Sequence, residues 1–206
     1  MKYNPDKHHR QSIRLQGYDY ASSGVYFITI CAYQRECLFG DIVDGEMQLN
    51  ELGQIVVGTY LWLATQYSYI DLDAWIIMPN HFHGILVLTD HSGEGVSRNA
   101  PTHLGQDVLR KACVIPETCG FERDNALPTN GIKRKSLGRL IGAFKTVSTK
   151  QINLFRDSPS APVWQRNYYD HIIRNEKSLQ YIRHYIHHNP LSWQRDQLHP
   201  GNPSKW

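Results

Sequence analysis

The sequence contains little cysteine and no long apolar segment. Its four cysteines form no C-x-x-C pair, which excludes a zinc knuckle or a disulfide framework and favours reduced thiols at Cys31, Cys37, Cys113 and Cys119. No apolar run approaches the roughly 18 residues that cross a bilayer, and residues 1–10 lack the apolar core of a signal peptide. We therefore expect a cytoplasmic protein with no membrane partner.

The composition is typical of a globular domain. Of the 206 residues, 41% are hydrophobic and 20% are charged, so we expect residues 1–206 to bury a proper core as a single domain. Residues 90–131 differ, because Gly, Ser, Pro, Thr and Asn dominate there and apolar periodicity disappears. So long a stretch without secondary structure is usually an insertion or binding loop, and the sequence predicts a flexible insertion at 90–131.

The net charge of +3 hides an uneven distribution along the chain. Residues 1–130 contain 9 Lys and Arg against 15 Asp and Glu, a net charge of −6, whereas residues 131–206 contain 13 against 4, a net charge of +9. A basic C-terminal third in an otherwise acidic protein indicates a polyanion bound on one side. A solvated surface with uneven charge is the alternative interpretation.

The most distinctive stretch is Trp75-Ile-Ile-Met-Pro-Asn-His-Phe-His-Gly84, in which a Pro-Asn break separates two apolar strands. Side chains alternate between the two faces of a strand, so His81 and His83 leave one face together while Phe82 points to the other. Two neutral imidazoles converging from one strand suit a divalent metal. The alternative is a polar, solvated strand face, but polar residues at the mouth of an otherwise buried hairpin favour the metal site.

Hydrophobic periodicity predicts the order of the remaining elements. We expect a strand at 25–32, a small hairpin at 40–49, a helix after the N-cap Asn50 to about 67, and strands at 74–78 and from 81 onward. An amphipathic helix follows at 136–155, then a partly extended segment at 163–174 and a last helix at 176–189. The order β-α-β-β-α-β-α predicts an α+β fold, a ferredoxin-like split βαβ antiparallel sheet with an added C-terminal helix.

The last predicted helix carries a tyrosine suited to chemistry. Tyr185 and Asn189, four residues apart, lie together along one edge of its apolar stripe. Taken alone, Tyr185 is an ordinary boundary tyrosine. Together with the histidine pair and the basic third of the chain, it suits phosphoryl transfer. A divalent ion would polarise a scissile phosphate, and Tyr185 would attack the phosphorus and become reversibly joined to DNA.

The chain resembles the REP-associated tyrosine transposases, a branch of the single-strand-specific transposases with an HUH (His-hydrophobic-His) nuclease fold. The resemblance covers nearly the whole chain except roughly residues 90–131. It rests on five segments: Arg14-Leu-Gln-Gly-Tyr-Asp-Tyr20, Met78-Pro-Asn-His-Phe-His83, Ser136-Leu-Gly-Arg-Leu-Ile-Gly-Ala-Phe-Lys145, Trp164-Gln-Arg-Asn-Tyr-Tyr-Asp-His-Ile-Ile-Arg-Asn175 and Tyr185-Ile-His-His-Asn-Pro190.

This resemblance implies His81 and His83 as metal ligands and Tyr185 as the nucleophile. It also implies Asn189 as a third ligand, at a position where the relatives first described carry glutamine. The implied activity is that of a Mg²⁺- or Mn²⁺-dependent endonuclease and strand transferase with a covalent 5′-phosphotyrosine intermediate. Its implied substrate is single-stranded or hairpin DNA containing repetitive extragenic palindromes. The resemblance allows a monomer or a homodimer. We expect the protein to be associated with the nucleoid when it is bound to DNA.

We expect DNA to be contacted by basic and aromatic residues, with an affinity that falls as salt rises. Tyr168 and its neighbour Tyr169 are also rival nucleophiles, although stacking on bases suits them better. The expected DNA-binding residues are Arg14, Lys133, Arg134, Lys135, Arg139, Lys145, Trp164, Arg166 and Tyr168.

Two other functions compete with the nuclease hypothesis. A ferredoxin-like sheet with exposed aromatic residues also suits a non-catalytic module that binds RNA or single-stranded DNA. Under this hypothesis, substitution of His81 or Tyr185 would leave function intact. A relative of replication initiators or relaxases would use the same chemistry, but the short chain argues against it.

Overall fold

Four antiparallel strands in the order β4-β5-β1-β6 form the central sheet of the computed structural model, which describes residues 15–90 and 134–202. The strands are β1 (Gly24–Cys31), β4 (Ile70–Met78), β5 (His81–Leu88) and β6 (Tyr169–Ile173). The central strand β1 pairs with β5 on one side and with β6 on the other. The chain order β1-α1-β4-β5-α3-β6 confirms the predicted split βαβ arrangement.

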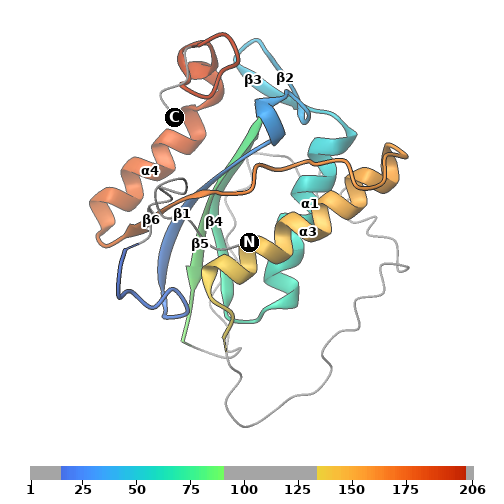
Figure 1. Cartoon of the computed structure of the whole chain (residues 1–206). Helices are drawn as coiled ribbons and strands as arrows, with labels where there is room; N and C mark the ends of the chain where they lie inside the picture. The colour runs from blue at the N-terminus through green and yellow to red at the C-terminus, as the bar shows by residue number, and fades with distance from the viewer. Residues whose placement is uncertain (1–14, 91–133, 203–206) are drawn as a thin grey trace, which may run out of the picture.

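Helices cover both faces of this sheet. Helices α1 (Glu51–Gln66) and α3 (Leu137–Phe155) lie side by side on one face, and α4 (Glu176–His188) lies on the other (Figure 1). The predicted hairpin is a separate two-stranded sheet of β2 (Gly40–Val43) and β3 (Glu46–Leu49). Two short 3₁₀ helices complete the description, η1 (Tyr33–Arg35) and η2 (Pro190–Arg195), the second directly after α4.

The alternation of side chains along β5 divides the core in two. Phe82 and Leu86 belong to the larger core, between the sheet and the α1–α3 layer, whereas Ile85 belongs to a smaller core with Ile182 and Ile186 of α4. Since successive strand residues face opposite sides, His81 and His83 lie on the α4 side with Ile85. The two histidines thus stand where the smaller core meets the end of α4.

Local sequence signals explain most of the element boundaries. The Asn50 side chain accepts a hydrogen bond from the Gly53 backbone N–H at 3.0 Å and caps α1 as predicted. Strand β4 begins earlier than predicted, at Ile70 instead of residue 74. Its first part, Ile-Asp-Leu-Asp, alternates apolar with acidic residues, and the pairing register shifts between Leu72 and Trp75.

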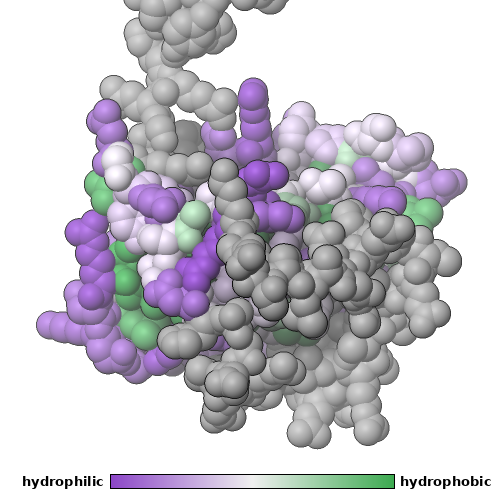
Figure 2. Space-filling view, turned by 90° about the horizontal axis from the view of Figure 1, so that it is seen from below, coloured by the Kyte–Doolittle hydropathy of each residue, from purple (hydrophilic) through white to green (hydrophobic). Residues whose placement is uncertain are grey.

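Residues 91–131 of the predicted insertion lie outside the described part of the chain, so that expectation stays a prediction. None of the helices within 15–90 and 134–202 is long and apolar enough to span a membrane. Seen from below the view of Figure 1, the described residues form a mainly hydrophilic face in which hydrophobic residues show only as small separate areas (Figure 2).

Replacing Phe82 by alanine should destabilise the fold strongly. The ring is fully buried between Tyr60 and Phe144, with ring centroids 4.7 and 5.5 Å away, so its removal leaves a cavity. We expect a loss of about 3–5 kcal/mol in the free energy of unfolding, measured by urea denaturation. Phe155→Ala is the matched control, because this α3 ring is 60% exposed. Equal losses in the two variants would contradict the described packing.

Candidate active site

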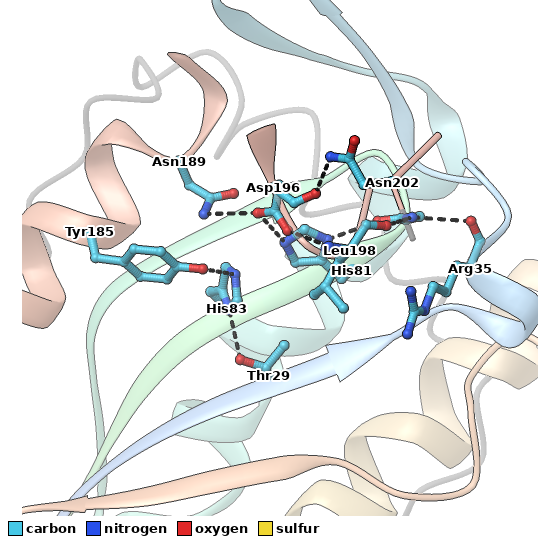
Figure 3. A network of polar contacts seen from close by, with 10 residues as sticks. Thr29, Arg35, His81, His83, Tyr185, Asn189, Asp196, Leu198 and Asn202 are labelled. Atoms are coloured by element: carbon cyan, nitrogen blue, oxygen red, sulfur yellow. Dashed lines mark hydrogen bonds and ion pairs between the residues drawn. The ribbon is translucent and has the colours of Figure 1, made fainter. Parts of the chain in front are cut away.

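The candidate active site lies at the start of β5, where His81 and His83 are both buried. Their ring centroids are 4.5 Å apart. Figure 3 shows Tyr185 and Asn189 approaching the histidines from α4 and Asp196 approaching from the segment after it. Residues from three separate parts of the chain therefore converge on one point.

Asn80, which is fully buried, fixes the orientation of the His81 ring. Its Nδ2 donates hydrogen bonds to the backbone carbonyls of Arg35 at 3.1 Å and Leu198 at 2.8 Å. Its Oδ1 is therefore left as an acceptor, and it lies 2.8 Å from Nδ1 of His81. The proton of the neutral ring is thus held on Nδ1, and the lone pair of Nε2 faces the site.

Thr29 of β1 plays the corresponding part for His83. Its Oγ1 lies 2.8 Å from Nδ1 of His83, and Nε2 of the same ring lies 3.2 Å from the hydroxyl of Tyr185. The Thr29 hydroxyl can donate to or accept from Nδ1, and in the tautomer with the proton on Nδ1 the ring donates to Thr29 while Nε2 accepts from the Tyr185 O–H. Phe27 stacks on the ring with centroids 5.4 Å apart. Both histidines thus present Nε2 to the same side.

A carboxylate reaches this point from the turn after η2. Asp196 Oδ2 lies 4.0 Å from Nε2 of His81 and accepts a 3.4 Å hydrogen bond from Nδ2 of Asn189. The turn is ordered by the Leu198 N–H, which donates to Asp196 Oδ1 at 2.6 Å, and by Asn202, whose Nδ2 donates to the Asp196 carbonyl at 2.7 Å. Asp196 was not among the site residues expected from the sequence. Its position as one of only four acidic residues in 131–206, shortly after Asn189, was the available signal.

The donor atoms around this point fit a divalent cation. Nε2 of His81 and Oδ1 of Asn189 are buried and have no hydrogen-bond partner within the described part of the chain. His81, His83 and Asp196 each offer a ligand atom, and these atoms lie within 4.8 Å of one another. Buried acceptors are almost always satisfied, so several lone pairs around one point indicate a cation site. The set of imidazole, carboxylate and amide donors, without thiolate, suits a hard or borderline metal.

Burial keeps the two imidazoles and the phenol of the site uncharged. Burial lowers the pKa of His83 to about 3, and burial together with the neighbouring His83 lowers the pKa of His81 well below its usual value of 6.5. Both rings are therefore neutral at pH 7, the state in which imidazole binds metal. Burial, followed by the negative charge of Asp196, raises the pKa of Tyr185 to about 12, so its hydroxyl is protonated at pH 7.

The structure brings together all four residues expected at the chemical centre. His81, His83, Tyr185 and Asn189 lie in one polar network (Figure 3). The two rival tyrosines lie on different faces of the sheet, Tyr169 on the face that carries α4. Tyr168 packs against the larger core on the opposite side of the sheet.

The residues expected to bind DNA are placed less uniformly. Arg14 and Lys133 lie outside the described residues. The prediction for Trp164 is corrected, because this ring is buried against Phe39 and Phe144 and its Nε1 donates to Ser148 at 2.8 Å. Trp164 is a core residue.

Several of the predicted basic residues make contacts within the protein. Lys145 donates hydrogen bonds from Nζ to the carbonyls of Gln165 and Asn167, both at 2.8 Å, and burial lowers its pKa to about 8. It therefore ties the segment before β6 to α3.

The basic residues before α3 lie at the far end of the sheet from the histidines. Arg134 pairs with Asp90 at 2.8 Å, and the Lys135 Nζ donates to the Tyr67 hydroxyl at 3.0 Å. These contacts are next to the end of β5, whereas the histidines begin that strand. Arg139 and Arg166 are exposed and can meet a polyanion directly.

Comparison with known proteins identifies one close relative and one shared fold. No model of a known protein family matches the chain. A Haemophilus influenzae protein described as uncharacterized is 38% identical over 198 residues, which cover 96% of this chain and 97% of the relative. The solved structure of a REP-associated tyrosine transposase bound to a REP hairpin matches with a TM-score of 0.51 and 16% identity. That match covers 96% of this chain and 91% of the transposase chain. The chain therefore belongs to the same family as the Haemophilus influenzae protein and has the fold of the REP-associated tyrosine transposase.

Proposed function

We propose that the protein is a metal-dependent single-stranded DNA endonuclease and strand transferase, with Tyr185 as its nucleophile. The observation that carries this proposal is the position of the Tyr185 hydroxyl, 3.2 Å from Nε2 of His83 and beside the unpartnered Nε2 of His81. The shared fold supports it, because the matching transposase was solved with a REP hairpin. We therefore propose palindromic hairpin DNA of the REP type as the substrate.

His81, His83 and Asp196, joined by Oδ1 of Asn189, would hold a divalent cation such as Mg²⁺ or Mn²⁺. When bound, this cation supplies Lewis-acid stabilisation of negative charge on the scissile phosphate. The protein itself supplies oriented ligands, because Asn80 and Thr29 hold the Nδ1 atoms and direct both Nε2 atoms into the site. Nε2 of His83 cannot serve as a ligand and accept from Tyr185 at once, so the hydroxyl becomes available to the substrate.

In the proposed reaction the Tyr185 oxygen attacks the phosphorus of a phosphodiester. A bond from Oη to phosphorus forms, the bond from phosphorus to the 3′ oxygen breaks, and the phenol proton is balanced by the proton that the released 3′ hydroxyl gains. The 5′-phosphotyrosine conserves the energy of the broken bond, so a later 3′ hydroxyl can reverse the step and join another strand.

The Tyr185 hydroxyl reaches His83 of its own chain. This geometry supports a monomer that assembles the complete site within residues 1–206, acting as one transposase domain.

Tyr185→Phe should abolish covalent attachment to DNA without loss of the metal site. Labelled single-stranded hairpin DNA is incubated with protein and Mn²⁺ or Mg²⁺, and the adduct is measured on a denaturing gel. We expect an adduct with the wild-type protein, none with EDTA and none with Tyr185→Phe, because phenylalanine has no attacking oxygen. Tyr181→Phe, which removes an exposed hydroxyl from the same helix, is the control and should form the adduct.

Two results would count against this assignment. An adduct that persists in Tyr185→Phe would move the nucleophile to another tyrosine. Binding of DNA without an adduct under any metal condition would favour the non-catalytic binding module.

Asn80→Ala should weaken metal binding even though Asn80 is not a ligand. The substitution removes the hydrogen bond that orients the His81 ring. It also removes the hydrogen bond to the Leu198 carbonyl, which belongs to the turn that carries Asp196. Partners that orient ligands typically contribute about 10–100-fold to metal affinity, and we expect a decrease of that size in a Mn²⁺ titration. The matched control is Asn153→Ala, which removes two hydrogen bonds of a buried asparagine in α3, on the opposite face of the sheet from the site. Equal Mn²⁺ affinity in both variants would refute the role of Asn80.

The buried, neutral histidines should make the metal-free protein sensitive to acid. The pKa of His83 is about 3 in the folded protein and about 6.5 when unfolded, so between these values the unfolded chain binds more protons. Stability is therefore fully present above pH 6.5 and falls as the pH falls, by about 1.4 kcal/mol per pH unit for this group. Urea unfolding in EDTA at pH 7, 6 and 5 measures the slope, which should be smaller by that amount in His83→Gln. Identical slopes would show that His83 does not titrate as described.

A further inference from the structure

We propose that Tyr181 of α4 and Tyr169 of β6 form a stacking platform for unpaired bases of the strand that carries the scissile phosphate. The proposal rests on the proposed function, because it names the surface by which single-stranded DNA reaches Tyr185. Both tyrosines are exposed, Tyr181 at 73% and Tyr169 at 43% of the residue surface. An exposed aromatic ring offers a flat face on which an unpaired base can stack.

Helix α4 is closed on the side that faces β4. Arg183 makes a paired interaction with Asp73 of β4 through Nε and a terminal nitrogen. At about 100° per residue, Tyr181, His184 and His188 lie on the other side of Tyr185, within about 100° of it. DNA can therefore approach Tyr185 from the side lined by these residues, where α4 is not packed on β4.

A surface depression lies on this open side. It has a volume of about 210 Å³ and is lined by Tyr181, His184, Tyr185, His188, Asn189 and Ser192. None of these residues is acidic, so nothing in the lining repels a phosphodiester. The His188 Nδ1–H donates to the His184 carbonyl at 2.9 Å, which fixes one imidazole beside the other, with ring centroids 3.8 Å apart. The depression is thus lined by the His184 and His188 rings and includes Tyr185, the proposed nucleophile.

Tyr169 brings a second aromatic ring to the same side from the sheet. It pairs with Thr29 of β1, so its side chain lies on the α4 face, whereas that of Tyr168 lies on the opposite face. The Phe27 ring meets Tyr169 edge-on at 6.4 Å and meets Tyr185 edge-on at 6.2 Å. Tyr169 therefore lies next to the site on the sheet side, separated from Tyr185 by the Phe27 ring. Tyr181 lies next to the site on α4.

This chemistry fits an unpaired strand. Bases stack on aromatic rings only when they are free of their complement, whereas a duplex offers mainly phosphates to a surface. The lining of the depression contains no lysine or arginine, so its affinity comes from stacking. Recognition of the unpaired strand is therefore carried by the aromatic residues near Tyr185.

Equilibrium binding in EDTA tests the platform separately from catalysis. All proteins carry Tyr185→Phe, and the probe is a fluorescent DNA hairpin with a single-stranded 5′ extension. Tyr181→Ala and Tyr169→Ala should each weaken binding by about 5- to 150-fold, the range measured for loss of one stacked base. Tyr181→Phe should bind as the parent does, because it keeps the ring. Phe155→Ala, an exposed ring on the α3 layer, is the control that should also leave binding unchanged.

Two further readouts distinguish stacking from other effects. The slope of log affinity against log salt should stay constant in the alanine variants, because no phosphate contact is lost. Pairing the extension with a complementary strand should remove the difference between variant and parent. Unchanged binding in both alanine variants, or a reduced salt slope, would overturn the proposal.

The two proposals can fail independently. If the wild-type protein forms no adduct but the alanine variants lose affinity for the single-stranded probe, the platform stands and the nuclease proposal fails. If the adduct forms and the alanine variants bind normally, the nuclease proposal stands and the platform fails.

Discussion

Two imidazoles are buried at the start of β5, and the Nδ1 atom of each needs a hydrogen-bond partner inside the protein. The rest of the site depends on this constraint. Asn80 satisfies this need for His81 and Thr29 satisfies it for His83, each at 2.8 Å. Because these partners occupy Nδ1, both Nε2 atoms face the same point as Asp196 and Asn189. The polar network is therefore incomplete on the side where a cation would complete it.

The two layers of the fold make this constraint possible. The larger core behind the sheet, which includes Phe82 between the histidines, holds β5 rigidly against α1 and α3. On the opposite face, α4 packs against the sheet through Ile182 and Ile186. This packing positions the Tyr185 hydroxyl next to His83. The segment after α4 is attached through the Leu198 carbonyl to Asn80, so Asp196 and His81 are positioned by the same buried amide.

Much of this arrangement could be predicted from local patterns. Alternation along β5 was enough to place His81 and His83 on one face, and the i,i+4 spacing on the last helix was enough to pair Tyr185 with Asn189. The element order was enough to predict the sheet. These features depend on residues close together in the chain, where periodicity carries the information.

What could not be predicted depends on contacts between distant segments. Asp196 and the Asn80 bonds to backbone carbonyls arise only when the C-terminal turn folds over the hairpin. Charge alone also could not separate Lys145, which ties down the segment before β6, from cations that face solvent. Aromatic character likewise did not separate the buried Trp164 from the exposed Tyr169. Both lie in one short segment, and their environments depend on distant pairing, Trp164 with Ala32 and Tyr169 with β1.

The most direct test of the account is a crystal structure of the wild-type protein soaked with Mn²⁺, recorded at a wavelength where manganese scatters anomalously. The account predicts one strong anomalous peak in contact with Nε2 of both His81 and His83, with Asp196 or Asn189 among its ligands. Density without such a peak at saturating Mn²⁺, or a peak bound elsewhere while both Nε2 atoms keep protein partners, would contradict it.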